Sequence, residues 1–109
     1  MVGSNQPNKI EPENTVLTDV VDGISLAAFP NPFSGTTTLK FALTREDHAS
    51  LRIYNLLGKE ITVLFEGPVE EKQSYSVVFS DESLSAGNYF ARLLTADGQQ
   101  RFIKLTLLP

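Results

Sequence analysis

The chain has 109 residues, the length of one ordinary domain with room for a single hydrophobic core. Hydrophobic residues make up 41% and charged residues 20%, which is the composition of a globular rather than a disordered protein. The net charge of −4 and the scattered Lys and Arg argue against binding to nucleic acid or to an anionic membrane, and the absence of cysteine excludes disulfides and thiolate metal sites.

The first part of the chain, residues 1–20, is polar and contains prolines together with several Asn and Glu residues. This composition predicts a linker or loose lead-in. No apolar stretch approaches the roughly 20 residues needed to cross a bilayer, and the N-terminus lacks the apolar segment of a signal peptide. The sequence therefore predicts a lead-in over 1–20 and one domain over 21–109.

Beyond the lead-in, apolar residues recur with a period of two, which is the pattern of half-buried β-strands. Five short strands are expected where this alternation begins at Ile24, Leu39, Ala49, Ile61 and Tyr75. Two longer strands follow at about 88–95 and 99–108, and Asp97-Gly98 between them predicts a type I′ hairpin turn. Seven short strands with turn residues at regular spacing predict an antiparallel, immunoglobulin-like β-sandwich. Its core is expected to contain Leu39, Phe41, Leu51, Ile53, Val63, Phe79, Leu93, Ile103 and Leu105.

A proline-rich stretch, Pro30-Asn31-Pro32, interrupts the strands near the start of the domain. Proline cannot donate a hydrogen bond to a sheet, so this stretch is expected to end the first strand or to hold it at an edge. Each proline also pushes the preceding residue towards extended backbone. We expect a stiff crossing segment, with Ser34-Gly35 closing the turn into a strand that begins near Thr36.

A second local motif precedes the sixth strand. In LSAGNY, residues 84–89, Gly87 and Tyr89 have the spacing of a tyrosine corner, in which a Tyr hydroxyl bonds back to upstream backbone. The alternative is a Tyr that simply packs in the core. Gly87 is compatible with both, since the turn before the strand could require a positive φ.

Three segments resemble the opening, middle and end motifs of the C-terminal sorting domains of the bacterial type IX secretion system, type A. In chain order they are FPNPFSGTTTLKFAL, SLRIYNLLGKEITVL and LSAGNYFARLLTADGQQRFIKLTLL, and together they cover about residues 24 to 108. The residues that this resemblance marks as sorting-motif candidates are Pro30, Asn31, Pro32, Tyr54, Gly58, Gly87, Tyr89, Arg101 and Lys104.

The resemblance implies a non-catalytic sorting signal that directs an N-terminal cargo through the type IX system to the cell surface or the medium. The implied partners are outer-membrane components of that system, namely its translocon and a sortase-like protease, together with the fused cargo domain. Neither nucleic acid nor insertion into a bilayer is implied. The lead-in before Ile24 would then contain the cargo junction and a protease-accessible linker.

Few residues are candidates for catalysis or metal binding. The only histidine, His48, follows Glu46 and Asp47, and three consecutive residues cannot easily converge on one ion, so a solvated turn is expected. Carboxylates at 70–71 and 81–82 indicate polar loops, with calcium binding as the alternative. Neither a Ser-His-Asp arrangement nor a phosphate-binding glycine loop is recognisable. No enzyme activity, no cofactor and no metal is therefore expected.

Two other functions compete with sorting. One is an immunoglobulin-like spacer or assembly module of a multidomain extracellular protein. The other is a carbohydrate-binding sandwich, which would usually present flat aromatic side chains. The chain has no Trp and three Tyr, and only Tyr54, beside a turn, is a candidate for such a surface.

Overall fold

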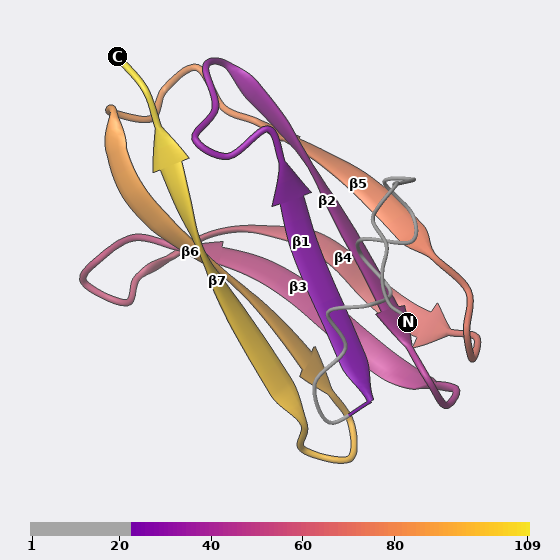
Figure 1. Ribbon diagram of the computed structural model, residues 1–109. Coiled ribbons are helices and arrows are strands. Elements are labelled where there is room, and N and C mark those ends of the chain that lie inside the picture. The colour runs from indigo at the N-terminus through magenta and orange to yellow at the C-terminus, as the bar shows by residue number, and fades with distance from the viewer. Residues whose placement is uncertain (1–22) are drawn as a thin grey trace, which may run out of the picture.

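The computed structural model describes residues 23–109, so the predicted lead-in over 1–20 lies outside the described residues. Figure 1 shows the described part as a set of β-strands. Their bounds are β1 (Ile24–Phe29), β2 (Thr36–Leu43), β3 (Asp47–Tyr54), β4 (Glu60–Val69), β5 (Tyr75–Ser80), β6 (Gly87–Thr95) and β7 (Gln100–Leu107). Residues 23–109 contain no helix that could cross a membrane.

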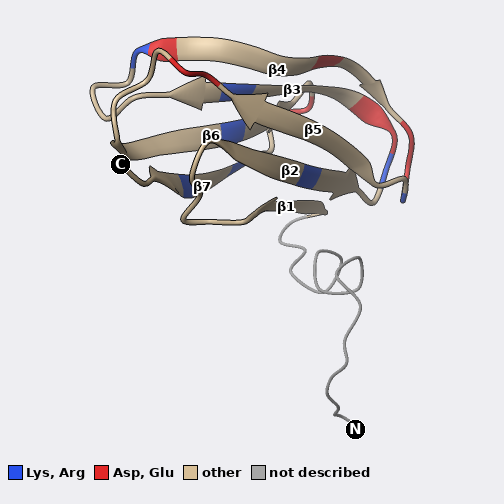
Figure 2. Cartoon of the chain, turned by 90° about the horizontal axis from the view of Figure 1, so that it is seen from above, with Lys and Arg blue, Asp and Glu red and all other residues tan. Residues whose placement is uncertain are grey.

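The strands form two packed sheets (Figures 1 and 2). One sheet has the order β1-β2-β5 and the other β4-β3-β6-β7. Every pair of neighbouring strands is antiparallel. The prediction of a seven-stranded, antiparallel, immunoglobulin-like sandwich is confirmed.

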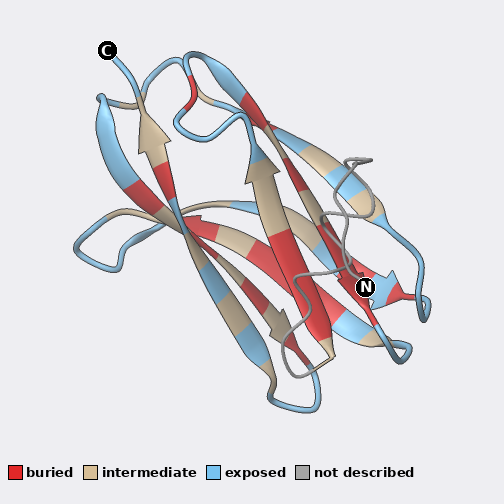
Figure 3. Cartoon of the chain, in the orientation of Figure 1, coloured by how far each residue is buried: buried red, intermediate tan, exposed pale blue. Residues whose placement is uncertain are grey.

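The core lies between the sheets, where alternate side chains of β2, β3 and β6 are buried (Figure 3). The largest fully buried side chains are Phe33, Phe41, Ile24, Leu26, Leu39, Leu51, Ile53, Leu93, Leu105 and Val69. Phe41 stacks on Tyr75 with ring centroids 5.4 Å apart and meets the edge of Phe65 at 5.1 Å. Ile103 is only partly buried but packs against this cluster.

The prediction that Val63 belongs to the core is wrong, because its side chain is 42% exposed. Two register shifts interrupt the pairing of β3 with β4, one of them between Leu51 and Arg52. Such irregularities break the period of two. Leu64 and Phe65 therefore both pack against the core, whereas Val63 is exposed.

The β6–β7 hairpin is present, but its turn is not of type I′. The Gly98 N–H donates to the Thr95 carbonyl at 3.0 Å, and the Thr95 N–H donates to the Gln99 carbonyl at 2.9 Å. Gly98 has φ of +96°, whereas Asp97 does not have a positive φ. This is a three-residue loop with a left-handed glycine. The Thr95 hydroxyl donates to the Asp97 carboxylate and accepts from the Gln99 N–H, which holds the wider loop.

The antiparallel registers give the sandwich two different ends. Gly23 lies at one end, beside the β2–β3, β4–β5 and β6–β7 connections. The other end, called the motif end below, consists of 29–36, 54–60, 81–87 and 107–109. In Figure 1 the β1–β2 connection and the C-terminus lie near one another at the top of the view, whereas the β3–β4 turn projects at the left, apart from them. By strand register all three sequence motifs contribute connections to the motif end, but they do not form one continuous patch.

Candidate functional site

The Pro30-Asn31-Pro32 segment lies against β7, which is an edge strand of the four-stranded sheet. The Asn31 Nδ2 donates to the Lys104 carbonyl at 2.8 Å, and the Thr106 N–H donates to the Asn31 Oδ1 at 3.1 Å. The side-chain amide thus supplies both a donor and an acceptor to the edge of β7. It replaces part of a missing neighbouring strand.

Phe33 continues this contact with its main chain. Its N–H donates to the Thr106 carbonyl at 2.9 Å, and its carbonyl accepts from the Leu108 N–H at 2.8 Å. This forms an isolated parallel bridge to Leu107. The Phe33 ring is buried and meets the edge of Phe79 at a centroid distance of 6.2 Å. Phe33 therefore bonds the β1–β2 connection to the end of β7 through its backbone, and its buried ring packs in the core.

These contacts correct one expectation about the proline segment. β1 ends at Phe29 and β2 begins at Thr36, as the prolines predicted. However, β1 and β2 are neighbours in the same sheet, so the segment does not cross between sheets. It is a connection within one sheet that holds the edge of the other. The Phe29-Pro30 and Asn31-Pro32 peptide bonds are both cis.

The tyrosine corner is confirmed. The Tyr89 hydroxyl donates to the Ser85 carbonyl at 2.6 Å, and the side chain is 8% exposed. Gly87 opens β6 with a positive φ of 142°. Gly87 pairs with Leu107 and Tyr89 with Leu105, so the corner also positions the end of β7.

The middle motif forms a hydrogen-bonded turn between β3 and β4. The Asn55 Oδ1 accepts from the N–H groups of Leu57 and Lys59, both at 2.9 Å. The backbone adds a bond from the Gly58 N–H to the Asn55 carbonyl and one from the Asn55 N–H to the Lys59 carbonyl. Gly58 has φ of +85°, a conformation that favours glycine. This turn holds Leu56 and Leu57 in solvent, with exposures of 63% and 93%.

Tyr54 precedes this turn and lies in one row with Phe90 and Lys104 across β3, β6 and β7. The Arg92 guanidinium lies over the Tyr54 ring, 5.2 Å from its centroid. One face of the ring is therefore covered by a cation instead of being open for a sugar. Beside it, Arg52 donates to Glu60 at 2.8 Å and to Glu66 at 3.0 Å. The hydrogen bond to Glu60 is the largest contribution to the raised pKa of Arg52.

The two basic candidates on β7 have different environments. Lys104 is exposed, and its carbonyl accepts from Asn31. Arg101 is half-buried, and its Nη1 donates to the Ile24 carbonyl at 3.3 Å. Arg101 therefore lies at the end of β7 away from the motif end. The structure gathers the other candidates around the motif end: Pro30, Asn31, Pro32, Tyr54, Gly58, Gly87, Tyr89 and Lys104.

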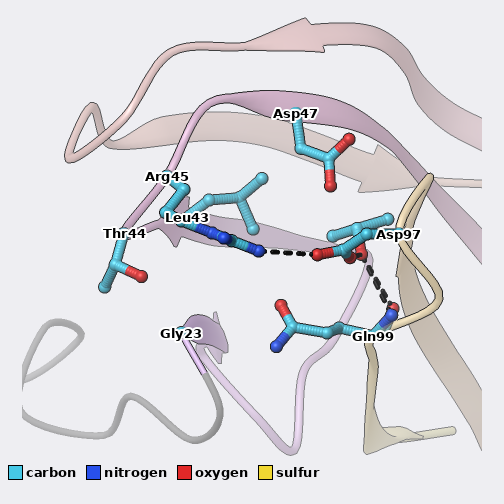
Figure 4. Close-up of a pocket in the computed structure, with 8 residues that line it drawn as sticks. Gly23, Leu43, Thr44, Arg45, Asp47, Asp97 and Gln99 are labelled. Atoms are coloured by element: carbon cyan, nitrogen blue, oxygen red, sulfur yellow. Dashed lines mark hydrogen bonds and ion pairs between the residues drawn. The ribbon is translucent and has the colours of Figure 1, made fainter.

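The opposite end of the domain is polar. A hollow of about 240 Å³ is lined by Gly23, Leu43, Thr44, Arg45, Asp47, Thr95, Asp97 and Gln99 (Figure 4). Across it, Arg45 Nη2 lies 2.9 Å from Asp97 Oδ2. The hydrogen bond from the Thr95 hydroxyl is the main reason that the pKa of Asp97 is lowered, and Arg45 adds to it.

His48 also lies towards this end. It is exposed, as expected, but it belongs to strand β3 and not to a turn, and its Nε2 lies 3.3 Å from Glu66 Oε2. A second hollow there is lined by Glu46, Asp47, His48, Pro68, Val69, Glu70 and Glu71. Within residues 23–109, no group of three or more His, Cys, Asp or Glu is placed to hold a metal ion.

Sequence reasoning did not identify three important features. The Asn31 side chain binds the edge of β7, Phe33 joins the core, and Leu56 and Leu57 are held in solvent. The Asn55 turn could have been expected from Asn followed by Gly three residues later, because Asn accepts hydrogen bonds from backbone two residues on. The exposure of the two leucines could not be predicted, because two adjacent apolar residues also occur in buried strands.

Comparison with known proteins agrees with the motifs. The family model for the secretion system C-terminal sorting domain matches residues 27–105. No curated protein matches the chain in sequence. Among solved structures, dimeric latent PorU from Porphyromonas gingivalis is similar with a TM-score of 0.56 and 18% identity over 82% of this chain. This chain spans only 10% of the length of PorU.

Two other structures are similar at lower scores. The Ig1 domain of mouse SynCAM 2 has a TM-score of 0.41 and 21% identity, covering 76% of this chain and 94% of that domain. CopC from Methylosinus trichosporium OB3b has a TM-score of 0.40 and 18% identity, covering 75% of this chain and 88% of CopC. The family match extends over most of the described residues. The chain therefore belongs to the family of secretion system C-terminal sorting domains, which mark proteins for export to the cell surface or the medium.

Proposed function

We propose that this chain directs an N-terminally attached cargo through the type IX secretion system. In this proposal residues 21–109 are the sorting domain, and residues 1–20 contain the junction with the cargo. The partners are the outer-membrane translocon, a sortase-like protease and the cargo itself. The role is non-catalytic, and the product is a protein at the cell surface or in the medium.

The observation that carries the proposal is the match of the sorting-domain family to residues 27–105, and the arrangement of the two ends supports it. Gly23, where the chain enters the described domain, lies beside the β2–β3 connection, at the end opposite the connections that contain the three motifs. A cargo attached before Gly23 would therefore project away from the motif end. The motif end would stay accessible to a receptor while the cargo is attached.

The use of the motif side chains also supports a recognition role. Asn31, Asn55 and Tyr89 all bond to backbone groups, so each holds a segment of the motif end in place. A surface that is fixed by its own hydrogen bonds loses little conformational entropy when a partner binds. The motif end therefore has the rigidity that a preformed recognition surface needs.

The experiment is an export assay. Residues 1–109 are fused to the C-terminus of a reporter that carries a signal peptide, in a host that has the type IX system. We expect the reporter at the surface or in the medium, and we expect it in the periplasm when the translocon is absent or the domain is omitted. A folded fusion that stays in the periplasm of the competent host would contradict the proposal.

An immunoglobulin-like spacer is the second candidate. It is favoured by the same separation of ends, because Gly23 and the C-terminus at opposite ends of an elongated domain suit a tandem array. A spacer would leave export of the reporter unchanged when the domain is replaced by an unrelated sandwich. A sorting signal would not tolerate that replacement.

A further inference from the structure

The most exposed apolar side chain of the motif end belongs to the β3–β4 turn. We propose that Leu56 and Leu57 insert into a concave apolar pocket on an outer-membrane protein of the export machinery. This inference rests on the proposed sorting function. The two leucines and the turn that carries them, residues 55–59, are called the leucine turn below.

The first argument is that hydrogen bonds fix the backbone conformation of the turn. The Asn55 carboxamide oxygen binds two backbone N–H groups, and the Gly58 N–H bonds to the Asn55 carbonyl. Gly58 adopts a φ of +85°, which closes the turn without strain. A turn held in this way fixes the backbone at Leu57. Binding then requires little additional ordering of the backbone.

The second argument is its place in the fold. The large apolar side chains exposed among residues 23–109 are Phe29, Leu56, Leu57, Val63, Val78, Phe102 and Leu108. Phe29, Leu108 and the two leucines belong to the motif end, whereas Val63, Val78 and Phe102 lie within strands. The leucine turn therefore belongs to the end away from Gly23, where it projects from the sandwich apart from the C-terminal residues (Figure 1).

The third argument concerns the chemistry of the partner. Two leucine side chains offer fewer buried methylene groups than one myristoyl chain, which alone binds membranes only marginally. The net charge of −4 also disfavours an anionic lipid surface. The turn continues into Lys59 and Glu60, and Glu60 already pairs with Arg52. A protein pocket surrounds both leucine side chains and excludes water from them. It is therefore the binding partner that fits this small apolar surface.

The test uses the full reporter fusion with Leu57→Ser, alone and with Leu56→Ser. Because both side chains are solvent-exposed, the melting temperature should stay unchanged. We expect the exported fraction to fall at least about fivefold, as for an apolar contact residue, with folded fusion accumulating in the periplasm. Leu57→Met should retain export, because it keeps an apolar side chain of similar size.

Val78→Ser is the matched control. Val78 is 63% exposed, as Leu56 is, but it lies on β5 rather than at the motif end. It should be exported like the unmutated fusion. If Val78→Ser reduces export as much as the leucine substitutions, surface hydrophobicity in general is responsible and the inference is wrong.

Two further outcomes would overturn the inference in distinguishable ways. Normal export of the double leucine variant removes the leucine turn from the signal but leaves the proposed sorting function intact, whereas failure of the unmutated fusion removes both. In flotation with vesicles of phosphatidylethanolamine and phosphatidylglycerol, the purified chain should not bind. Binding that disappears in Leu57→Ser would identify lipid instead of a protein pocket as the partner.

Discussion

Asn31 and Asn55 show how one residue type does two different tasks in this domain. At Asn31 the side-chain amide both donates, to the Lys104 carbonyl, and accepts, from the Thr106 N–H. At Asn55 only the carbonyl oxygen of the amide is used, as an acceptor from two N–H groups. An aspartate has no donor when ionised, so it can replace the second asparagine but not the first.

This difference gives a matched pair of substitutions. Asn55→Asp should change the free energy of unfolding by no more than about 0.5 kcal/mol, because both accepted bonds remain. Asn31→Asp should lower it by about 1–2 kcal/mol, because the carboxylate faces the Lys104 carbonyl without a proton between them. Urea unfolding measures the effect of both substitutions. Equal effects of the two substitutions would contradict the assigned hydrogen bonds.

Tyr89 allows a direct test of the tyrosine corner. Its hydroxyl donates to the Ser85 carbonyl, and Ser85 is itself exposed. Tyr89→Phe keeps the packed ring but removes this bond, and water can reach the carbonyl in its place. We expect a loss of about 1 kcal/mol in the free energy of unfolding, near the net value of one hydrogen bond. A variant as stable as the parent would show that packing of the ring alone holds the corner.

Asp97 gives a pH-dependent prediction. The Thr95 hydroxyl, the Gln99 N–H and Arg45 hold the pKa of its carboxyl below the ordinary range. A carboxyl whose pKa is lower in the folded state stabilises the fold above its unfolded pKa, and this contribution is lost as the pH falls through the folded pKa. Thr95→Val should raise the pKa of Asp97 towards about 3.9, the value of an unperturbed Asp. An NMR titration of the side-chain carboxyl checks this, and an unchanged pKa would assign the effect to the Gln99 N–H and Arg45.

At the scale of elements, the strand pattern could be predicted well because each strand buries one face. The alternation that begins at Ile24, Leu39 and Ala49 corresponds to β1, β2 and β3. The buried face of β4 was predicted wrongly because its register shifts depend on how it pairs with β3. The sequence period of a single strand does not reveal such a shift. The predicted type I′ turn between β6 and β7 is wrong because the Thr95 side chain bonds to Asp97 and to the Gln99 N–H. These bonds stabilise a three-residue loop instead of a two-residue turn.

Among the candidate residues, a contact between near neighbours in sequence could be predicted, whereas contacts between distant segments could not. Tyr89 has a local partner four residues away, so spacing alone identified the corner. Asn31 binds groups more than seventy residues away, and such a contact follows only from the assembled sheets. Arg101 lies two residues before Ile103 on β7, so both side chains point to the same face of the strand. On that face the Arg101 guanidinium donates to the Ile24 carbonyl.

The basic residues of β7 provide the prediction at this scale. Lys104→Glu should leave the free energy of unfolding within about 0.5 kcal/mol, because the side chain is exposed and only its backbone carbonyl is used by Asn31. Arg101→Glu should lower it by about 1–2 kcal/mol, since the half-buried guanidinium donates to the Ile24 carbonyl. Thermal unfolding compares the two variants.

In the export assay, Lys104→Glu tests charge recognition separately from folding. A receptor that reads the outer face of β7 would lose an attraction and meet a like charge, so the fusion should accumulate in the periplasm. Arg101→Glu cannot serve for this purpose, because its effect on stability would be mixed with any effect on recognition. Unchanged export of Lys104→Glu would remove this charge from the signal.

For the whole molecule, the separation of the two ends makes the direction of cargo attachment important. The described domain extends 44 Å along its longest axis. Gly23 lies at one end, and the proline segment, the leucine turn and Leu108 belong to the other. If the machinery reads the motif end, a folded domain placed before Gly23 leaves that end free, whereas one placed directly after Pro109 covers it.

The last prediction follows from this geometry. A compact second domain fused directly after Pro109 should abolish export of a reporter attached at the N-terminus, while the melting temperature stays the same because Leu108 and Pro109 are exposed. The same domain on a Gly/Ser linker of about 20 residues should restore part of the export, because such a linker separates its ends by roughly 25 Å, enough to uncover the motif end. A spacer would be indifferent to both fusions, since neither blocks the junction at Gly23. Full export of both fusions would therefore contradict recognition at the motif end.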